Sequence, residues 1–192
     1  MNDPQLAQER SARATSESRY LTDEVKALVG VTGPVMVALR PLTEERLRRF
    51  VHGVMETQFM HTDPDGAASS KFGGLVATPL WPTHAFVREL GDPDPLDALQ
   101  DDPEWDGIPP SASSNGLPPI PTELGRLLNG GTEAVFRQMP RIGDVISSRA
   151  RYSDVAYRDG TSGPFLVVKV ETTYTNQDGD VLAIITVSII RR

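Results

Sequence analysis

The stretch that decides the fold is residues 145–190, VISSRARYSDVAYRDGTSGPFLVVKVETTYTNQDGDVLAIITVSII. It contains three runs that are rich in β-branched and aromatic residues, at Val145–Tyr157, Pro164–Thr175 and Val181–Ile190. Runs of this kind, separated by short polar segments, are typical of β-strands joined by hairpins. The C-terminal part of the chain therefore predicts an antiparallel meander.

The segments between these runs contain residues that tight turns favour. Asp159-Gly160 and Asp178-Gly179 both tolerate the positive φ of a short hairpin loop, so we expect the two turns there. Val181–Ile190 is almost continuously apolar, which predicts a central strand. The run before it has one apolar face at alternating positions, formed by Leu166, Val168, Val170 and Tyr174.

Two further strands are predicted upstream. Thr132–Arg137 has strand-forming residues, and Asn129-Gly130-Gly131 just before it marks a bend or a bulge. Gly33–Leu39, GPVMVAL, predicts a first strand. Because helical patterns come first and the meander follows, the element order is that of an α+β fold.

The clearest helical pattern is Thr43–Met55. Thr43 is a natural N-cap, and Glu44 and Glu45 follow in the first turn, where the helix dipole favours negative charge. Apolar residues recur at the spacing of one buried face: Leu47, Phe50, Val51, Val54 and Met55. We therefore expect this helix to pack against the sheet.

The polar segment of residues 1–19 predicts a frayed N-terminal tail, and residues 20–192 predict a single domain. Within it, short helices are expected over Tyr20–Leu28 and about Pro79–Leu90. Residues 91–121 are rich in Pro, Asp, Gly and Ser, and this segment is longer than a simple connecting loop in a compact domain. They predict an inserted segment, either a lid or part of the wall of a substrate tunnel.

The composition excludes several classes of function. The formal net charge of −7 makes general binding to nucleic acid or to anionic membranes unfavourable, although a local basic cluster remains compatible with an anionic ligand. The chain has no cysteine, which excludes disulfides, thiolate nucleophiles and cysteine–metal sites. Without an apolar run of about 18 residues or a signal-peptide core, a cytoplasmic location is the default expectation.

Two sequence blocks resemble the MaoC-like hydratase/dehydratase family, and in particular its amino-terminal-half dehydratase domain. The first is ETQFMHTDP at residues 56–64 followed by AASSKFGGLVATP at 67–79. It is similar to the hydratase motif of that family, in which an Asp precedes a His by five residues and a Phe-Gly then opens the central helix. The second block comprises LNGGTE at 128–133, RIGD at 141–144 and ETTYTNQDG at 171–179.

The resemblance implies a hot-dog fold, an antiparallel sheet wrapped around a central helix, with two such units pairing edge to edge. It also implies the addition of water to trans-2-enoyl thioesters or its removal from 3-hydroxyacyl thioesters. Coenzyme A, or sometimes acyl carrier protein, would carry the acyl group as part of the substrate. No separate cofactor and no metal site are expected.

By the same resemblance, Glu56 and His61 are the candidate catalytic residues, and Glu56 stands where the family has Asp. The extra methylene of Glu displaces the carboxylate by about 1 Å, which can reduce the rate about a hundredfold. The glycine that supplies the oxyanion amide in the family aligns with Pro79, which has no N–H. The candidate substrate-binding residues are Asp63, Phe72, Gly73, Gly74 and Pro79.

Three functions follow from this pattern. The leading hypothesis is the supporting subunit of a heteromeric enoyl-CoA hydratase whose partner carries the complete catalytic set. The alternatives are a self-sufficient homodimeric hydratase that uses Glu56 and His61, and a non-catalytic acyl-CoA-binding or structural hot-dog module. His61 also has a plain structural interpretation, as a polar loop residue that makes one hydrogen bond.

Overall fold

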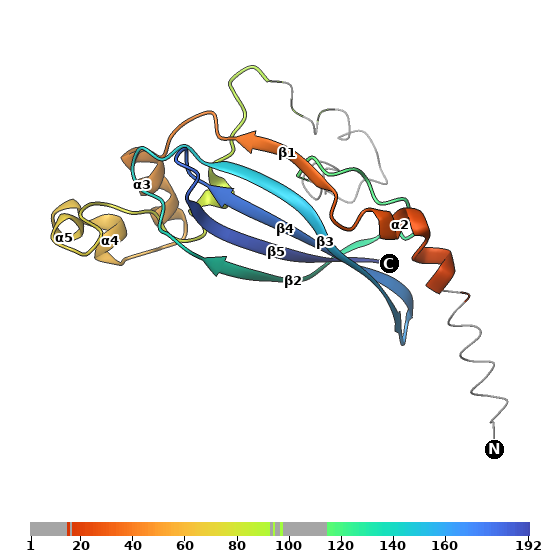
Figure 1. Ribbon diagram of the computed structural model, residues 1–192. Helices are drawn as coiled ribbons and strands as arrows, with labels where there is room; N and C mark the ends of the chain where they lie inside the picture. The colour runs from red at the N-terminus through yellow and green to blue at the C-terminus, as the bar shows by residue number, and fades with distance from the viewer. Residues whose placement is uncertain (1–14, 16, 93, 95–96, 98–114) are drawn as a thin grey trace.

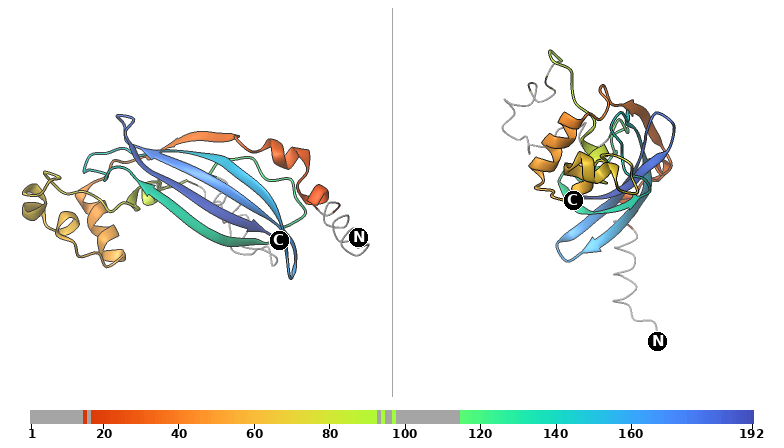
Figure 2. Two further views of the ribbon diagram at one scale, coloured as in Figure 1. Left: turned by 60° about the horizontal axis from the view of Figure 1, so that its bottom comes forward. Right: turned by 90° about the vertical axis from the view of Figure 1, so that its left-hand side faces the viewer.

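The computed structural model describes residues 15, 17–92, 94, 97 and 115–192. Most of the predicted tail at residues 1–19 and of the predicted insertion at 91–121 lies outside these residues, so both stay predictions. The described residues form one curved and twisted sheet of five antiparallel strands (Figure 1). Helices α3, α4 and α5 lie together at one end of the sheet and α2 at the other (Figures 1 and 2).

The sheet has β4 in its middle and β1 and β2 at its edges. The strands follow in the order β1 (Thr32–Val37), β3 (Ser147–Gly160), β4 (Gly163–Thr175), β5 (Val181–Arg191) and β2 (Leu127–Phe136). All neighbouring pairs are antiparallel, so the predicted meander is confirmed. The strand β5 is an inner strand, in agreement with its apolar sequence.

The first hairpin turn does not lie where the sequence predicted it. Asp159 and Gly160 belong to β3, and the pairing of Gly160 with Gly163 leaves Thr161-Ser162 as the loop. The register is set by pairs such as Val155 with Val168, which bury apolar side chains on one face. The second turn agrees with the prediction, since Gly179 takes a φ of +83°.

The bulge expected at Asn129-Gly130-Gly131 is present in β2. The pairing of β2 with β5 shifts register between Asn129 and Thr132, and Gly131 has a φ of +110°. The Asn129 side chain accepts a hydrogen bond from the Gly131 amide, which stabilises the bend. Beyond the bulge, the pairing runs regularly to Phe136.

Helix α3 (Glu44–Gly53) confirms the strongest helical prediction. The Thr43 side chain accepts a hydrogen bond from the Arg46 amide, as an N-cap does, and Leu47 and Val51 are buried. Helix α2 (Asp23–Ala27) is shorter than the predicted Tyr20–Leu28, although residues 17–20 are helical as well.

The helix predicted over Pro79–Leu90 is wrong. The structure has only a single 3-10 turn there, η1 (Trp81–His84), followed by irregular backbone. Pro82 lacks an N–H and is tolerated only in the first turn of a helix. Trp81 and Ala85 are buried in the core, and the Arg46 guanidinium donates to the Ala85 carbonyl at 2.8 Å. Tertiary contacts therefore hold this segment without a longer helix.

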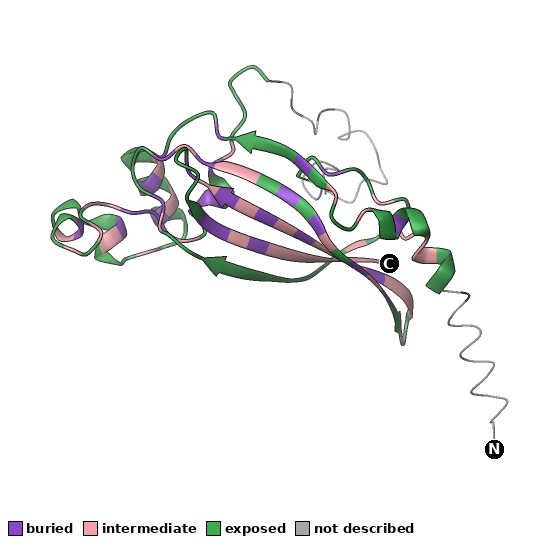
Figure 3. Ribbon diagram, in the orientation of Figure 1, coloured by how far each residue is buried: buried purple, intermediate pink, exposed green. Residues whose placement is uncertain are grey.

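The core consists of two apolar clusters, in each of which residues of the inner strands pack with residues of helices and loops. One lies at the α3 end of the sheet and includes Leu42, Leu47, Trp81, Ile146 and Leu182. The other lies towards α2 and includes Val25, Leu117, Tyr157, Leu166 and Val168. Figure 3 shows the alternation of buried and partly buried residues along β4, whereas β2 is exposed along almost its whole length.

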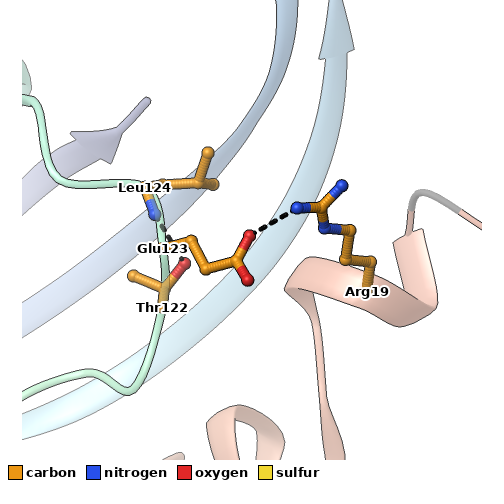
Figure 4. A network of polar contacts seen from close by, with 4 residues as sticks. All are labelled: Arg19, Thr122, Glu123 and Leu124. Atoms are coloured by element: carbon orange, nitrogen blue, oxygen red, sulfur yellow. Dashed lines mark hydrogen bonds and ion pairs between the residues drawn. The ribbon is translucent and has the colours of Figure 1, made fainter.

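The N-terminal helical turn is connected to the segment before β2 by an ion pair. The Arg19 guanidinium lies 2.6 Å from the Glu123 carboxylate, and the Thr122 side chain accepts a hydrogen bond from the Leu124 amide (Figure 4). Both charged side chains are mostly exposed, so the pair contributes little to stability. In the part of the chain that the structure describes, no helix has the length and apolar character required to cross a membrane.

Candidate functional site

The candidate catalytic carboxylate Glu56 forms hydrogen bonds within its own loop. Its Oε1 accepts hydrogen bonds from the backbone amides of Thr57, at 2.8 Å, and Gln58, at 2.9 Å. These amides lie just before α4 (Phe59–Thr62), and the Gln58 side chain makes no capping bond. Glu56 therefore stabilises the turn into α4, which is a structural function for a carboxylate.

The same hydrogen bonds keep the Glu56 carboxylate charged. They lower the pKa of Glu56, with the Gln58 amide as the largest cause and the Thr57 amide next. Desolvation opposes this effect on the pKa, and a smaller electrostatic interaction with His61 acts in the same direction as the two amides. A general base for hydration works best with a pKa close to the operating pH, and these contacts shift Glu56 away from that range.

The candidate catalytic imidazole of His61 is buried on α4, with 4% of its surface exposed. Its Nδ1 lies 2.7 Å from the Val76 carbonyl oxygen. A carbonyl oxygen can only accept, so Nδ1 carries the proton and Nε2 is the basic nitrogen of the neutral ring. His61 thus makes the hydrogen bond that its structural interpretation predicts, but it does so as a buried residue of α4 and not in a polar loop.

A small cavity of about 220 Å³ lies between α3 and the α4 region, and His61 lines it. Glu56 does not line this cavity. Its other lining residues come mainly from α3, with one each from α4, from α5 and from the segment after α5: Glu44, Leu47, Arg48, Val51, His52, Thr62, Pro64 and Leu75. The two candidate catalytic residues are therefore near one another without facing a common space.

The segment Leu75–Pro79 connects His61 to the end of β2. The Val76 amide donates to the Met60 carbonyl in α4, and Val76 forms an isolated β-bridge with Arg141. The next amide, of Ala77, donates to the Pro140 carbonyl at 2.8 Å. These contacts hold Val76 and Ala77 between α4 and the loop after β2, and they thereby fix the position of Thr78 and Pro79.

Thr78 is a feature of this segment that the sequence analysis did not single out. Its hydroxyl is buried, and within the described residues it has no hydrogen-bond partner. A buried hydroxyl without a partner costs about 1–3 kcal/mol, so such groups are uncommon. Thr78 immediately precedes Pro79, the residue that aligns with the oxyanion glycine.

The five predicted substrate-binding residues do not gather in one place. Phe72 and Pro79 line a second cavity, whereas Asp63, Gly73 and Gly74 do not. Asp63 is exposed and caps α5 (Pro64–Ala68) by accepting a hydrogen bond from the Asp65 amide. Gly73 has a φ of +68°, so it is required by the backbone of this turn.

The second cavity, of about 480 Å³, also brings together three basic residues that the sequence analysis missed. Lys71, Arg137 and Arg141 line it beside Phe72 and Pro79. Lys71 is more than sixty positions away from Arg137 and Arg141 along the chain, and only the fold brings it beside them. The sequence signal that could have indicated this cluster is the pair of arginines, Arg137 and Arg141, four positions apart in a chain that is acidic as a whole.

The chemistry available at the site is that of an imidazole, backbone amides and guanidinium groups. In the described part of the chain, no group of three or more His, Asp or Glu residues could hold a metal ion.

Comparison with known proteins agrees with this architecture. A family model for the FAS1-like dehydratase domain region matches residues 30–185, which is most of the chain. The chain therefore belongs to this family of hydratase and dehydratase domains. No curated protein matches it.

Solved structures show the same fold at low sequence identity. The chain aligns with the ChsH1–ChsH2 complex from Mycobacterium tuberculosis at a TM-score of 0.65 and 16% identity, over 89% of this chain and 90% of that one. A MaoC-like dehydratase from Rhodospirillum rubrum gives 0.52 and 22%, over 84% and 94%. The HadBC complex from M. tuberculosis, a (3R)-hydroxyacyl-ACP dehydratase, gives 0.51 and 16%, over 82% and 95%. The α+β hot-dog fold and the MaoC-like family are thus confirmed.

Proposed function

We propose that this chain is the supporting half of a hydratase or dehydratase that acts on trans-2-enoyl and 3-hydroxyacyl thioesters. A second hot-dog chain would supply the Asp–His pair and the oxyanion amide. The observation that carries the proposal is that the Glu56 carboxylate is hydrogen-bonded within its own loop. This carboxylate is bound to the amides of Thr57 and Gln58 and does not line the cavity that His61 lines.

Hydration requires a base that activates water and an acid that protonates the α-carbon, both facing the same substrate. Turning Oε1 of Glu56 towards a substrate would break its two hydrogen bonds from backbone amides, which stabilise its charged form. The supporting role does not require this rearrangement, because the proton transfers would take place on the partner.

The position of Pro79 supports the same conclusion. As the enolate forms, negative charge develops on the thioester oxygen, and a missing oxyanion donor typically lowers turnover about 10²–10³-fold. Pro79 offers no amide hydrogen there. A partner with an intact motif would provide this donor in the second active site of the pair.

The edge strand β2 gives such a partner a place to pair. Within the described chain it pairs only with β5. The Arg137 amide donates to the Leu182 carbonyl, and amides alternate in direction along a strand, so those of Ala134 and Phe136 point away from β5. Val135 and Phe136 are about half exposed on this strand. Two of the structures with this fold, ChsH1–ChsH2 and HadBC, are complexes.

The test is a reconstitution with an identified partner. Tagged full-length chain is purified from its native host, an accompanying hot-dog chain is identified by mass spectrometry, and both are produced alone and together. We expect negligible hydration of crotonyl-CoA by this chain alone and substantial hydration by the pair. His61→Ala in this chain should leave the rate of the pair within about twofold, whereas alanine at the partner's motif histidine should abolish it.

One observation favours the self-sufficient homodimer as the second candidate. His61 lines a cavity, and its hydrogen bond to the Val76 carbonyl leaves Nε2 as the basic nitrogen, the form that a catalytic histidine needs as a base. If the pure chain hydrates crotonyl-CoA and loses that activity in both His61→Ala and Glu56→Ala, this candidate replaces the supporting half. A pair without any hydratase activity would instead indicate the non-catalytic module.

A further inference from the structure

The cavity at the end of β2 has an electrostatic character opposite to that of the whole chain. It is lined by Lys71, Phe72, Pro79, Phe136, Arg137, Gln138, Met139 and Arg141. Three of these residues are cationic and none carries a carboxylate, although the formal net charge of the chain is −7. A concave surface with charges of one sign raises the local concentration of counter-ions. The cavity therefore attracts anions.

The cationic side chains of this cavity have no ion-pair partner in the described part of the chain, although the Asp144 carboxylate accepts a hydrogen bond from the Arg141 backbone amide at 2.7 Å. Among the described residues, no ion pair involves Lys71, Arg137 or Arg141. The Arg141 Nη1 donates to the Phe72 carbonyl at 2.6 Å, which holds the Lys71–Phe72 loop against the end of β2. The Lys71 ammonium lies 5.0 Å from the centre of the Phe72 ring. Neither contact neutralises the positive charge.

Apolar surface lies beside the cations. Phe72, Pro79, Phe136 and Met139 make up half of the lining residues. A volume of about 480 Å³ is within the usual range for a small-molecule site, roughly 300–1,000 Å³. A ligand that suits this lining combines several phosphate charges with a flat ring. Guanidinium groups bind phosphates in bidentate fashion, and aromatic faces stack on purines.

On the basis of the proposed function, we infer that this cavity binds the 3′-phosphorylated ADP end of coenzyme A. The thioester carrier would then be coenzyme A rather than a carrier protein. A carrier protein presents its acyl group on phosphopantetheine, which has a single phosphodiester and no nucleotide. Coenzyme A adds a pyrophosphate, a 3′-phosphate and adenine, and these groups match three unpaired cations and two phenylalanines.

The backbone connects this cavity to the candidate catalytic segment. Pro79 lines the cavity, whose two walls are joined by the β-bridge between Val76 and Arg141 and by the hydrogen bond from the Ala77 amide to the Pro140 carbonyl. The same Val76 accepts the hydrogen bond of His61. The pantetheine arm of a nucleotide bound here would leave the cavity beside the Leu75–Pro79 segment, where the acyl group would be needed.

The experiment measures binding by calorimetry on the full-length chain, without turnover. The probes are coenzyme A, 3′,5′-ADP, dephospho-coenzyme A and 4′-phosphopantetheine. The variants are Lys71→Ala and Arg137→Ala, since Arg141 also holds the loop. Arg126→Ala is the matched control, because Arg126 is an exposed arginine just before the opposite end of β2. Thermal unfolding verifies that each variant is folded.

We expect coenzyme A and 3′,5′-ADP to bind, and the dissociation constant of each to rise about tenfold or more in Lys71→Ala and in Arg137→Ala. Arg126→Ala should change it less than about twofold. Dephospho-coenzyme A should bind more weakly than coenzyme A, and affinity should fall with added salt.

Two results would overturn the inference. One is a coenzyme A affinity that neither variant changes. The other is 4′-phosphopantetheine binding as tightly as coenzyme A, which would indicate that the nucleotide is not recognised and that a carrier protein is the source of the acyl group. Neither readout depends on catalysis. Nucleotide binding that requires Arg137, together with an inactive pair, would contradict the supporting-half proposal and leave the cavity assignment intact.

Discussion

The strands β4 and β2 belong to the same sheet and have similar lengths, yet their surroundings differ completely. On β4, burial alternates regularly from Leu166 to Tyr174, and both neighbouring strands are present. On β2, nearly every residue is exposed, and only β5 lies beside it in the described chain. The inner strands have a neighbouring strand on each side. We call β2 and the basic cavity at its end the open side, because they carry groups without partners in the described chain.

The difference indicates that the inner strands provide the stability of this sheet, and the groups in the proposed function lie mainly on its open side. The inner strands bury the apolar clusters and need nothing from outside. The open side has outward-facing amides and three cations without an ion-pair partner among the described residues, and the unpaired hydroxyl of Thr78 is on the residue just before Pro79, which lines the cavity. Polar and charged groups without partners contribute no stability to an isolated chain. They form hydrogen bonds or ion pairs when a partner or an anionic ligand binds.

The largest expected effect compares the same substitution on the two strands. Leu166→Ala should lower the free energy of unfolding by about 3 kcal/mol, because Leu166 is fully buried in the β4 cluster. Leu128→Ala on β2 should lower it by less than about 1 kcal/mol, because Leu128 is 37% exposed. Chemical denaturation of both variants provides the measurement. Equal losses would show that β2 is packed as firmly as β4.

The second test concerns the open edge of β2. Ala134→Pro removes an amide hydrogen that points away from β5, so the isolated chain should lose less than about 1 kcal/mol of stability. Association with the partner should weaken about tenfold or more, as measured by analytical ultracentrifugation of the pair. Ala134→Ser keeps the amide and serves as the control. Unchanged association of Ala134→Pro would mean that the partner binds elsewhere.

The third test uses the buried hydroxyl of Thr78. Thr78→Val keeps the shape and removes an unpaired polar group, so the free energy of unfolding should rise by about 1 kcal/mol. Thr172 is the matched control, because its hydroxyl accepts a weak hydrogen bond from Asn115. Thr172→Val should be neutral or destabilising. A loss of stability in Thr78→Val would indicate that this hydroxyl is satisfied in the folded chain.

The smallest expected effect is the pH dependence that Glu56 contributes. Hydrogen bonds from Gln58 and Thr57 lower the pKa of Glu56 in the folded chain from its ordinary value of 4.5. Its contribution is therefore fully present above the ordinary pKa and is lost as the pH falls through the lowered one. Glu56→Gln should reduce the melting temperature at neutral pH, and the difference from wild type should shrink in acid. A constant difference at every pH would contradict this assignment.

Much of the fold was predictable because its signals are local. The strand runs, the capping of α3 by Thr43 and the bulge at Gly131 each depend on neighbouring residues, and each is present. The turn at Asp159-Gly160 was wrong, since the register follows from the buried faces of two long strands. The helix over Pro79–Leu90 was wrong, since Trp81 and Ala85 are held by core contacts and Arg46 rather than by helical hydrogen bonds.

The candidate site was predictable only in part. The family motif drew attention to Glu56, His61 and Pro79, and their catalytic roles stay predictions. It did not indicate that the Glu56 carboxylate binds the backbone of its own turn, because hydrogen-bond direction depends on side-chain rotamers.

By itself, the sequence determined the α+β order, the meander and the chemistry missing at Pro79, because periodicity, capping and the lack of an amide hydrogen are properties of short segments. Only the tertiary structure decided which groups meet. It gathered Lys71, Arg137 and Arg141 around one cavity, and it separated Glu56 from the space that His61 lines. The physical reason is that contacts between distant segments depend on strand register and loop path, which the whole core sets together.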